Sequence, residues 1–234
     1  MNELELREQM CLVGRLMHQN GYIDGKSGNL TARLDPERIL ATPSGSAKGF
    51  MNPDQLMIVN IDDGKTANDQ SRPTSELAMH LECYKQRADV QGVVHAHPPT
   101  AVALTLVGYD FQQCILPEMV MLLGLVPTIP YATPASSENL DAISQLIVEH
   151  DAIMLSHHGS LTVAATLWDA YLRLESLEHS ARILYMAAQM PGGIRVIPSQ
   201  QLEKVLAIRK RLGLWKPGDD ERFRTCCGME SSAS

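Results

Sequence analysis

The chain has 234 residues, 44% of them hydrophobic and 20% charged, and its formal net charge is -7. This composition indicates one globular domain with a substantial core, and no apolar run reaches the about 18 residues that a membrane span needs. The negative charge argues against general affinity for nucleic acids or anionic membranes, because both need a positive surface. The acidic, polar start MNELELREQM is unlike a signal peptide, so we expect a cytoplasmic protein.

Five cysteines are scattered along the chain and form no CxxC pair. They are Cys11, Cys83, Cys114, Cys226 and Cys227. An odd number at irregular spacing does not indicate a disulfide framework. We therefore expect reduced thiols.

The first third of the chain predicts one helix, three short strands and a second helix. Apolar residues recur at helical spacing over residues 6–17, and Gly21 follows as a C-terminal stop. SGNLTARL, RILATPSG and LMIVNIDDGK then read as strands with turn residues between them. Pro73 opens the next helix, with Thr74 and Ser75 as capping candidates.

In the rest of the chain, strands alternate with helices. VQGVVHAH predicts a buried strand, PPTAVALTLVG and SSENLDAISQLIVEH predict helices, and DAIMLSHHGSLTVAA predicts two strands joined by a turn. A long helix is expected over residues 167–189 and a last one at SQQLEKVLAIRKRLG, before a disordered tail over residues 225–234. Hairpins in one place and alternation in another indicate a mixed sheet with helices on its faces.

The histidines are the first candidates for chemistry. His95 and His97 stand at i and i+2 on the predicted strand, so their side chains point the same way and could share one metal ion. Taken alone, the pair is a weak motif and favours two polar residues at a strand end over a metal site. A zinc site needs at least a third ligand, and either His157 or His158 could supply it. The remaining histidines are expected to be packed or solvated: His18, His80, His150 and His179.

Five motifs occur in the order in which one known family has them: SGNLTARL, TPSG, RPTSELAMH, VVHAH and LSHHGSLT. On these motifs the chain resembles the class II aldolase/adducin family, most closely its L-fuculose-1-phosphate aldolase branch. The resemblance runs from the first helix to about Arg211. It implies an α/β fold, a three-layer αβα sandwich with a mixed, largely antiparallel central sheet, formed by residues 1–224 as one domain.

The resemblance also implies roles for single residues. The zinc ligands would be His95, His97 and His158, and the acid of RPTSELAMH would be Glu76, acting as general base. Without the resemblance, Glu76 is a carboxylate in a first helical turn, where it favours the helix dipole.

A phosphate site follows from the same resemblance. Its members would be Asn29, Ser44, Gly45, Thr74 and Ser75. Hydroxyls, an amide and a glycine N–H near a helix N-terminus can hold a phosphate without a lysine. Each of these residues alone would also suit plain turn or capping chemistry.

The implied activity is zinc-dependent, reversible cleavage of a ketose 1-phosphate to dihydroxyacetone phosphate and an aldehyde, in a homotetramer with active sites between subunits. The branch has two tyrosines beside the aldehyde, and here those positions hold Leu116 and Leu212. Glu118 could replace the first tyrosine or could be a surface carboxylate. The two leucines favour a less hydroxylated aldehyde, as from a deoxy- or methylthio-ribulose 1-phosphate.

Several alternatives stay open at this stage. A sugar-phosphate 4-epimerase, a dehydratase or a decarboxylase of the same superfamily would use the same zinc ligands. A non-catalytic, adducin-like interaction domain is less compatible with a complete ligand set. All-imidazole ligation also accepts cobalt, manganese or iron in place of zinc.

Overall fold

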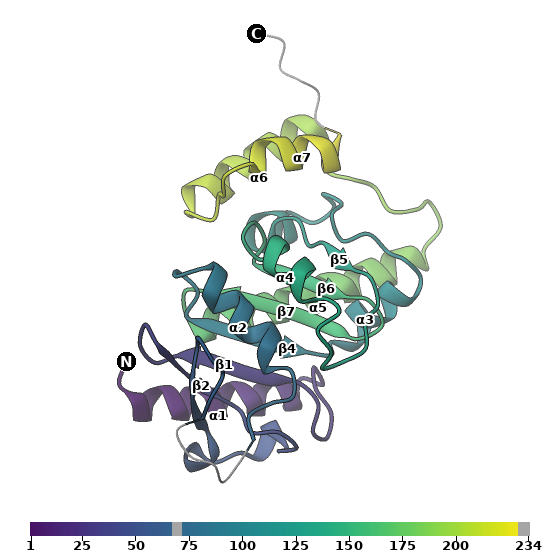
Figure 1. Cartoon of the computed structure of the whole chain (residues 1–234). Coiled ribbons are helices and arrows are strands. Elements are labelled where there is room, and N and C mark those ends of the chain that lie inside the picture. The colour runs from purple at the N-terminus through teal and green to yellow at the C-terminus, as the bar shows by residue number, and fades with distance from the viewer. Residues whose placement is uncertain (67–71, 229–234) are drawn as a thin grey trace.

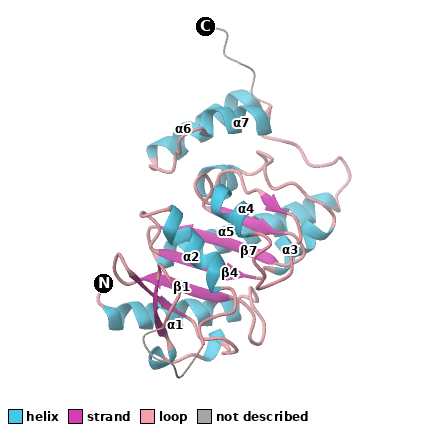
Figure 2. Cartoon of the chain, in the orientation of Figure 1, coloured by secondary structure: helices cyan, strands magenta, loops and turns pink. Residues whose placement is uncertain are grey.

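The computed structural model describes residues 1–66 and 72–228. Its strands are β1 (Asn29–Arg33), β2 (Arg38–Ala41), β3 (Met57–Asn60), β4 (Gly92–Ala96), β5 (Thr128–Ile129), β6 (Ala152–Leu155) and β7 (Gly159–Ala164). They form one seven-stranded sheet in the order β3-β2-β1-β4-β7-β6-β5, drawn in Figures 1 and 2. Only β5 and β6 pair in parallel among the described strands. The expected mixed, largely antiparallel sheet is confirmed.

Helices cover both faces of this sheet. They are α1 (Glu3–Gln19), α2 (Leu77–Gln86), α3 (Pro99–Leu106), α4 (Leu140–Leu146), α5 (Leu167–Ala188), α6 (Ser199–Arg211) and α7 (Asp219–Cys227). Two short 3-10 helices, η1 (Lys48–Phe50) and η2 (Pro53–Gln55), and one π-helix, η3 (Met119–Leu123), complete the set that the structure describes. One core lies between the sheet and α1 with α5, and a second lies between the sheet and α2 with α4. Of these described helices, none is long and apolar enough to cross a membrane.

The central strand β4 shows why the histidine pair follows an apolar run. All five of its residues are buried, because helices pack on both faces of the sheet. Val94 belongs to the core beside α1 and α5, and Val93 belongs to the core beside α2 and α4. Since side chains alternate along a strand, His95 shares the face of Val93, on the side of α2 and α4.

The C-terminal part of the chain differs from the prediction. The helix α6 is not the last one, because α7 follows it and extends through Cys227. The expected disordered tail is therefore wrong for residues 225–227, and residues 229–234 lie outside the described part of the chain. The sequence of α7 is mostly polar and gives no clear helical period. Its Phe223 is buried against Leu206 and Val120, so the helix depends on tertiary packing.

The cysteine prediction is wrong for one pair. Cys114 and Cys227 form a disulfide with a Cα–Cα distance of 5.6 Å, although 113 positions separate them. The fold brings α7 against the segment that contains Cys114, and no spacing rule could have indicated this proximity. Cys11 and Cys83 are free and buried, and Cys226 is free and exposed.

Candidate active site

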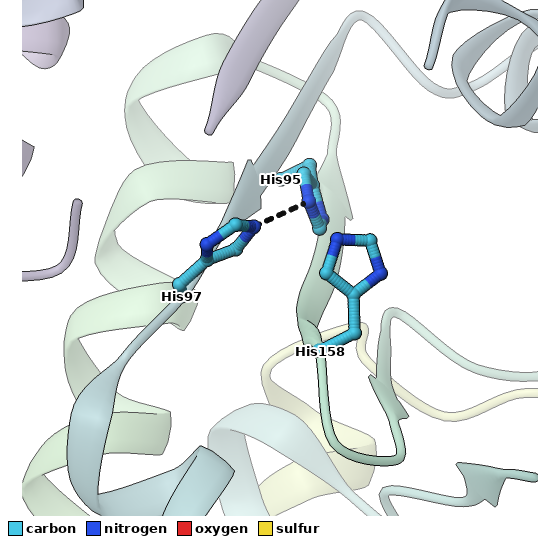
Figure 3. A group of neighbouring side chains, drawn as sticks. All are labelled: His95, His97 and His158. Carbon is cyan, nitrogen blue, oxygen red and sulfur yellow. Dashed lines mark hydrogen bonds between the residues drawn. The ribbon is translucent and has the colours of Figure 1, made fainter. Parts of the chain in front are cut away.

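The end of β4 and the start of β7 bring three histidines together. His95 is fully buried and pairs with Leu161 of β7 across the sheet. His97 follows the strand, and its Nε2 atom lies 3.1 Å from Nε2 of His95. His158 precedes β7, and its ring centroid lies 4.9 Å from that of His95 and 5.0 Å from that of His97. Figure 3 shows the three rings converging on one point.

The turn between β6 and β7 decides which of its two histidines joins the group. His157 takes a positive φ of 62°, which reverses the chain and turns its side chain away. The His157 ring contacts Tyr131 instead, and its backbone N–H donates to Thr105 Oγ1. His158 is therefore the histidine that faces the pair on β4, as the resemblance implied.

Gly159 makes this close approach possible. A Cβ atom at Gly159 would lie 2.4 Å from the carbonyl oxygen of Ala96, 2.9 Å from the His97 ring and 3.0 Å from the His95 ring. Any side chain would thus push the two strand ends apart. The glycine after His158 is required because the backbone passes against the other two histidines.

The three imidazoles fit a metal ion. One ligand nitrogen from each lies within 4.8 Å of the others. The separation of the Nε2 atoms of His95 and His97 is close to the roughly 3.3 Å expected for two nitrogens about 2.05 Å from one tetrahedral zinc. His95 donates its Nδ1–H to the carbonyl oxygen of Ser160 over 3.0 Å, which leaves the Nε2 lone pair for an ion. Burial, with repulsion from His95 and His158, lowers the pKa of His97 to about 4.

Glu76 completes this group, and we call Glu76, His95, His97 and His158 the histidine site. Its carboxylate oxygens lie 3.2 Å from Nε2 of His95 and 3.2 Å from Nε2 of His158. Burial favours the neutral acid, but the adjacent imidazoles, His95 foremost, and the hydrogen bond from Asn29 outweigh it and hold the pKa of Glu76 well below its usual range. The site therefore contains a carboxylate directed at the point where the imidazoles converge.

The start of α2 differs from the prediction. Thr74 and Ser75 do not cap it; the N-cap residue is Glu76, and no side chain caps the helix. The helix begins later because Pro73 and Thr74 pair with a neighbouring segment, and Ser75 and Glu76 then form a turn. Thr74 donates its backbone N–H to Thr42, and Pro43 and Pro73 form an isolated β-bridge.

The two predicted phosphate segments lie side by side as a result. Ser44 donates its backbone N–H to the carbonyl oxygen of Arg72, which joins the loop of Ser44 and Gly45 to the strand-like residues before Thr74. Gly45 has a positive φ of 70°, a conformation that favours glycine. Ser44 and Ser75 are exposed, while Thr74 is buried and its hydroxyl accepts from the Glu76 N–H. Their binding of phosphate stays a prediction.

Asn29, whose binding of phosphate also stays a prediction, contacts both Glu76 and His80. Its Nδ2 atom donates to Oε2 of Glu76 over 2.8 Å, and its Oδ1 atom lies 2.5 Å from Nε2 of His80. The side chain is buried and directly engaged with the carboxylate. At least one of its amide hydrogens is therefore donated to Glu76 in a hydrogen bond.

His80 is the residue that sequence reasoning undervalued. It is fully buried, and burial together with repulsion from His95 lowers its pKa to about 3, so the imidazole is neutral. The available signal was its spacing of four residues from Glu76, which places both on one side of α2.

A cavity opens beside Glu76 and His158. It is bounded by the segment from Ala132 to Ser136, by the start of α4 and by Met79 of α2. Within the described lining, Glu76 and His158 are the titratable side chains; the others are apolar groups, hydroxyls and one amide. Leu116, Glu118 and Leu212 do not line it, and Glu118 and Leu212 are exposed.

This fold, with three converging histidines and an adjacent carboxylate, defines a class of proteins. The chain belongs to the class II aldolase/adducin family: the family model described as Class II Aldolase and Adducin N-terminal domain matches residues 8–185. Enzymes of this family generally depend on a divalent metal ion.

The chain is similar to several characterised members. A 3-oxo-tetronate 4-phosphate decarboxylase of Escherichia coli (strain K12) is 32% identical over 193 residues, which are 81% of this chain and 90% of that protein. A 5-methylthioribulose-1-phosphate/5-deoxyribulose-1-phosphate aldolase of Escherichia coli O45:K1 (strain S88) is 33% identical over 199 residues, with 79% and 91% covered. An L-fuculose 1-phosphate aldolase structure shares the fold, with a TM-score of 0.80 at 23% identity over 89% of this chain and 96% of that one.

Proposed function

We propose that this chain is a divalent-metal-dependent decarboxylase of a phosphorylated 3-oxo sugar acid, with 3-oxo-tetronate 4-phosphate as the first substrate to test. Relatives of that name are 31% to 32% identical over about four fifths of this chain. The proposal therefore takes up an alternative that the motifs left open, in place of the aldolase activity that the family branch implied.

The observation that carries the proposal is the small number of proton carriers in the cavity. Retro-aldol cleavage needs one group to take the proton from the hydroxyl of the departing fragment and one to protonate carbon. Decarboxylation needs only the second, because carbon dioxide leaves from an ionised carboxylate. The described cavity lining offers Glu76 and the proposed ligand His158. The places at which the resemblance puts two tyrosines fall at about Leu116 and about Leu212.

In the proposed reaction, the bond between C1 and C2 breaks and C1 leaves as carbon dioxide. The electron pair of that bond moves onto C2 and is delocalised to the C3 ketone oxygen. A proton added at C2 then gives dihydroxyacetone phosphate. When bound by His95, His97 and His158, a divalent ion such as zinc would supply Lewis-acid polarisation of the ketone and adjacent hydroxyl oxygens.

The residues of the chain have separate tasks in this scheme. Glu76, ionised before the reaction, takes a proton from water and passes it to C2, since it is the carboxylate that lies against the histidines. Ser44, Gly45, Thr74 and Ser75 hold the phosphate through hydroxyls and backbone N–H groups. The apolar wall around Met79 limits the water near the reacting carbon.

Aldol cleavage is the second candidate, and one feature of the cavity favours it. Met79, Leu140 and Ile143 line the wall beyond Glu76, and such a surface suits the apolar end of a deoxy- or methylthio-ribulose 1-phosphate. A relative with that activity is 33% identical. An L-fuculose-1-phosphate-like substrate has a similar length but a more polar end.

The test is a substrate panel with the zinc-loaded protein. We expect 3-oxo-tetronate 4-phosphate to yield equal amounts of carbon dioxide and dihydroxyacetone phosphate, measured with a coupled dehydrogenase. Release of dihydroxyacetone phosphate from ketose 1-phosphates without carbon dioxide would establish the aldolase instead. An epimer or a dehydrated product would indicate those superfamily activities, and no turnover of any compound would indicate a non-catalytic, adducin-like domain. We also propose a cytoplasmic homotetramer, which sedimentation and fractionation would check.

A further inference from the structure

Five polar side chains form a continuous row of hydrogen bonds, which we call the file. It leads from the histidine site into the protein interior between α2 and β1. Asn29 donates to Glu76 over 2.8 Å and contacts Nε2 of His80 over 2.5 Å. Nδ1 of His80 lies 2.8 Å from Thr31 Oγ1, which lies 3.0 Å from the hydroxyl of Tyr84. Asn29, Thr31, His80 and Tyr84 are each at most 5% exposed.

The regular spacing of the two elements creates this file. Glu76, His80 and Tyr84 follow one another at intervals of four, so they share one side of α2. Asn29 and Thr31 alternate along β1 and share one face of the sheet. Asn29 also pairs with His95 in the register between β1 and β4, so the file begins beside a proposed metal ligand.

The carboxylate at one end of the file can only accept hydrogen bonds, and this fixes which group donates in each hydrogen bond of the file. An ionised carboxylate only accepts, so Asn29 presents its Nδ2–H to Glu76 and its Oδ1 to His80. The neutral imidazole must then carry its proton on Nε2, which leaves Nδ1 to accept from the Thr31 hydroxyl. Thr31 Oγ1 in turn accepts from Tyr84. Turning the Asn29 amide over would place two acceptors against each other at Glu76 and two donors against each other at His80.

We propose that His80 is a positioning residue for the reaction. It fixes the Asn29 amide so that its N–H points to Glu76 and holds that carboxylate against His95 and His158. The inference rests on the proposed role of Glu76 as proton carrier. His80 itself lies beyond the reach of the substrate, because Asn29 stands between it and Glu76.

The first test uses Thr31, where one hydroxyl can be removed with little change in shape. We expect Thr31→Val to leave Nδ1 of His80 without a donor and to lower kcat about tenfold, with unchanged KM and zinc content. Thr31→Ser keeps the hydroxyl and should restore kcat to within about twofold. Thr162→Val is the matched control: Thr162 is equally buried, and its hydroxyl donates to the carbonyl of Ala170, outside the file.

A normal kcat in Thr31→Val, or an equal loss in Thr31→Ser and Thr162→Val, would overturn the positioning role. The second measurement needs no substrate. In ¹⁵N-histidine spectra of the zinc-loaded wild-type protein, with the His80 signal identified by its loss in His80→Gln, the proton should sit on Nε2. A proton on Nδ1 would overturn the proposal. Failure to turn over 3-oxo-tetronate 4-phosphate would instead refute the proposed function and leave this result standing.

Discussion

Two clusters of polar and charged side chains lie at opposite ends of strands β4 and β7, and they differ in how their charges are paired. At one end, the histidine site places three imidazoles and Glu76 against one another beside a cavity. At the other end, Asp151 lies among Arg87, Arg173 and Lys216, and we call these four residues the Asp151 cluster. Both carboxylate oxygens of Asp151 form ion pairs with basic side chains. In the histidine site, by contrast, the groups that face one another carry lone pairs.

This difference separates a site for chemistry from a site for stability. Removing one partner from a buried group of opposite charges, such as the Asp151 cluster, destabilises a fold because it leaves buried charge unpaired. Three imidazoles that face one another stabilise the fold little by their mutual contacts. A metal cation between them would coordinate the ligand nitrogen of each. Changes in the histidine site should therefore alter activity, and changes in the Asp151 cluster should alter stability.

The largest effect is expected for Glu76→Gln. The amide cannot carry a proton to C2, so kcat should fall about a thousandfold, while zinc content and the melting temperature stay close to those of the wild type. Steady-state kinetics, metal analysis and calorimetry would measure these quantities. Glu82→Gln, on the same helix, is the control and should keep full activity. If Glu76→Gln retained wild-type kcat, Glu76 would have no part in proton transfer.

The next largest effect is expected for Asp151→Asn. It leaves three cations without their shared partner, so the free energy of unfolding should fall by about 3 kcal/mol, with kcat unchanged. Urea denaturation would measure the loss. Asp89→Asn is the control, because Asp89 also pairs with Arg87 but its side chain is 65% exposed, and its loss should be much smaller. A loss of activity without a loss of stability would erase the distinction between the two sites.

The free energy of unfolding should depend on pH through the ionisation of Asp151 in the same cluster. Burial favours the neutral acid, but attraction to Arg173, Lys216 and Arg87 lowers the pKa of Asp151 to about 2. A lowered carboxyl pKa stabilises the fold above the unfolded pKa, and the contribution is lost as pH falls through the native one. About 2 kcal/mol should thus disappear between about pH 5 and pH 2. Subtracting the profile of Asp151→Asn isolates this part, and identical slopes would contradict the assignment.

The smallest effect is expected for His157→Ala. His157 neighbours His158 in sequence, but its side chain is exposed and its ring contacts Tyr131. Zinc content should not change, and kcat should change by less than about twofold. Metal analysis with kinetics would check this, and loss of the ion would show that His157 ligates it.

Periodicity and motif order were enough to predict the sheet, most helices and the three converging histidines. The strand pattern of VVHAH places His95 and His97 on one face, and the glycine after His158 marks a tight approach. The sequence did not indicate which segments far apart along the chain lie side by side in the fold. The disulfide between Cys114 and Cys227 depends on how α7 packs, and α7 itself has few apolar residues to reveal it.

Local rules also failed where two segments compete for the same backbone. Thr74 and Ser75 have the composition of helix caps, but the backbone of Thr74 pairs with Thr42 and delays the helix to Leu77. His80 looked like an ordinary packed histidine, because its importance comes from Asn29 and Thr31 on a distant strand. Such roles become visible only in three dimensions.

Metal analysis of the purified protein tests the central claim most directly. The wild type, loaded with zinc and freed of excess, should hold a single zinc per chain, and His97→Ala should hold almost none and lose its activity. A chelator should abolish wild-type activity, and added zinc should restore it. A wild-type protein that takes up no zinc, cobalt, manganese or iron, or an equally active His97→Ala, would contradict a metal centre formed by His95, His97 and His158.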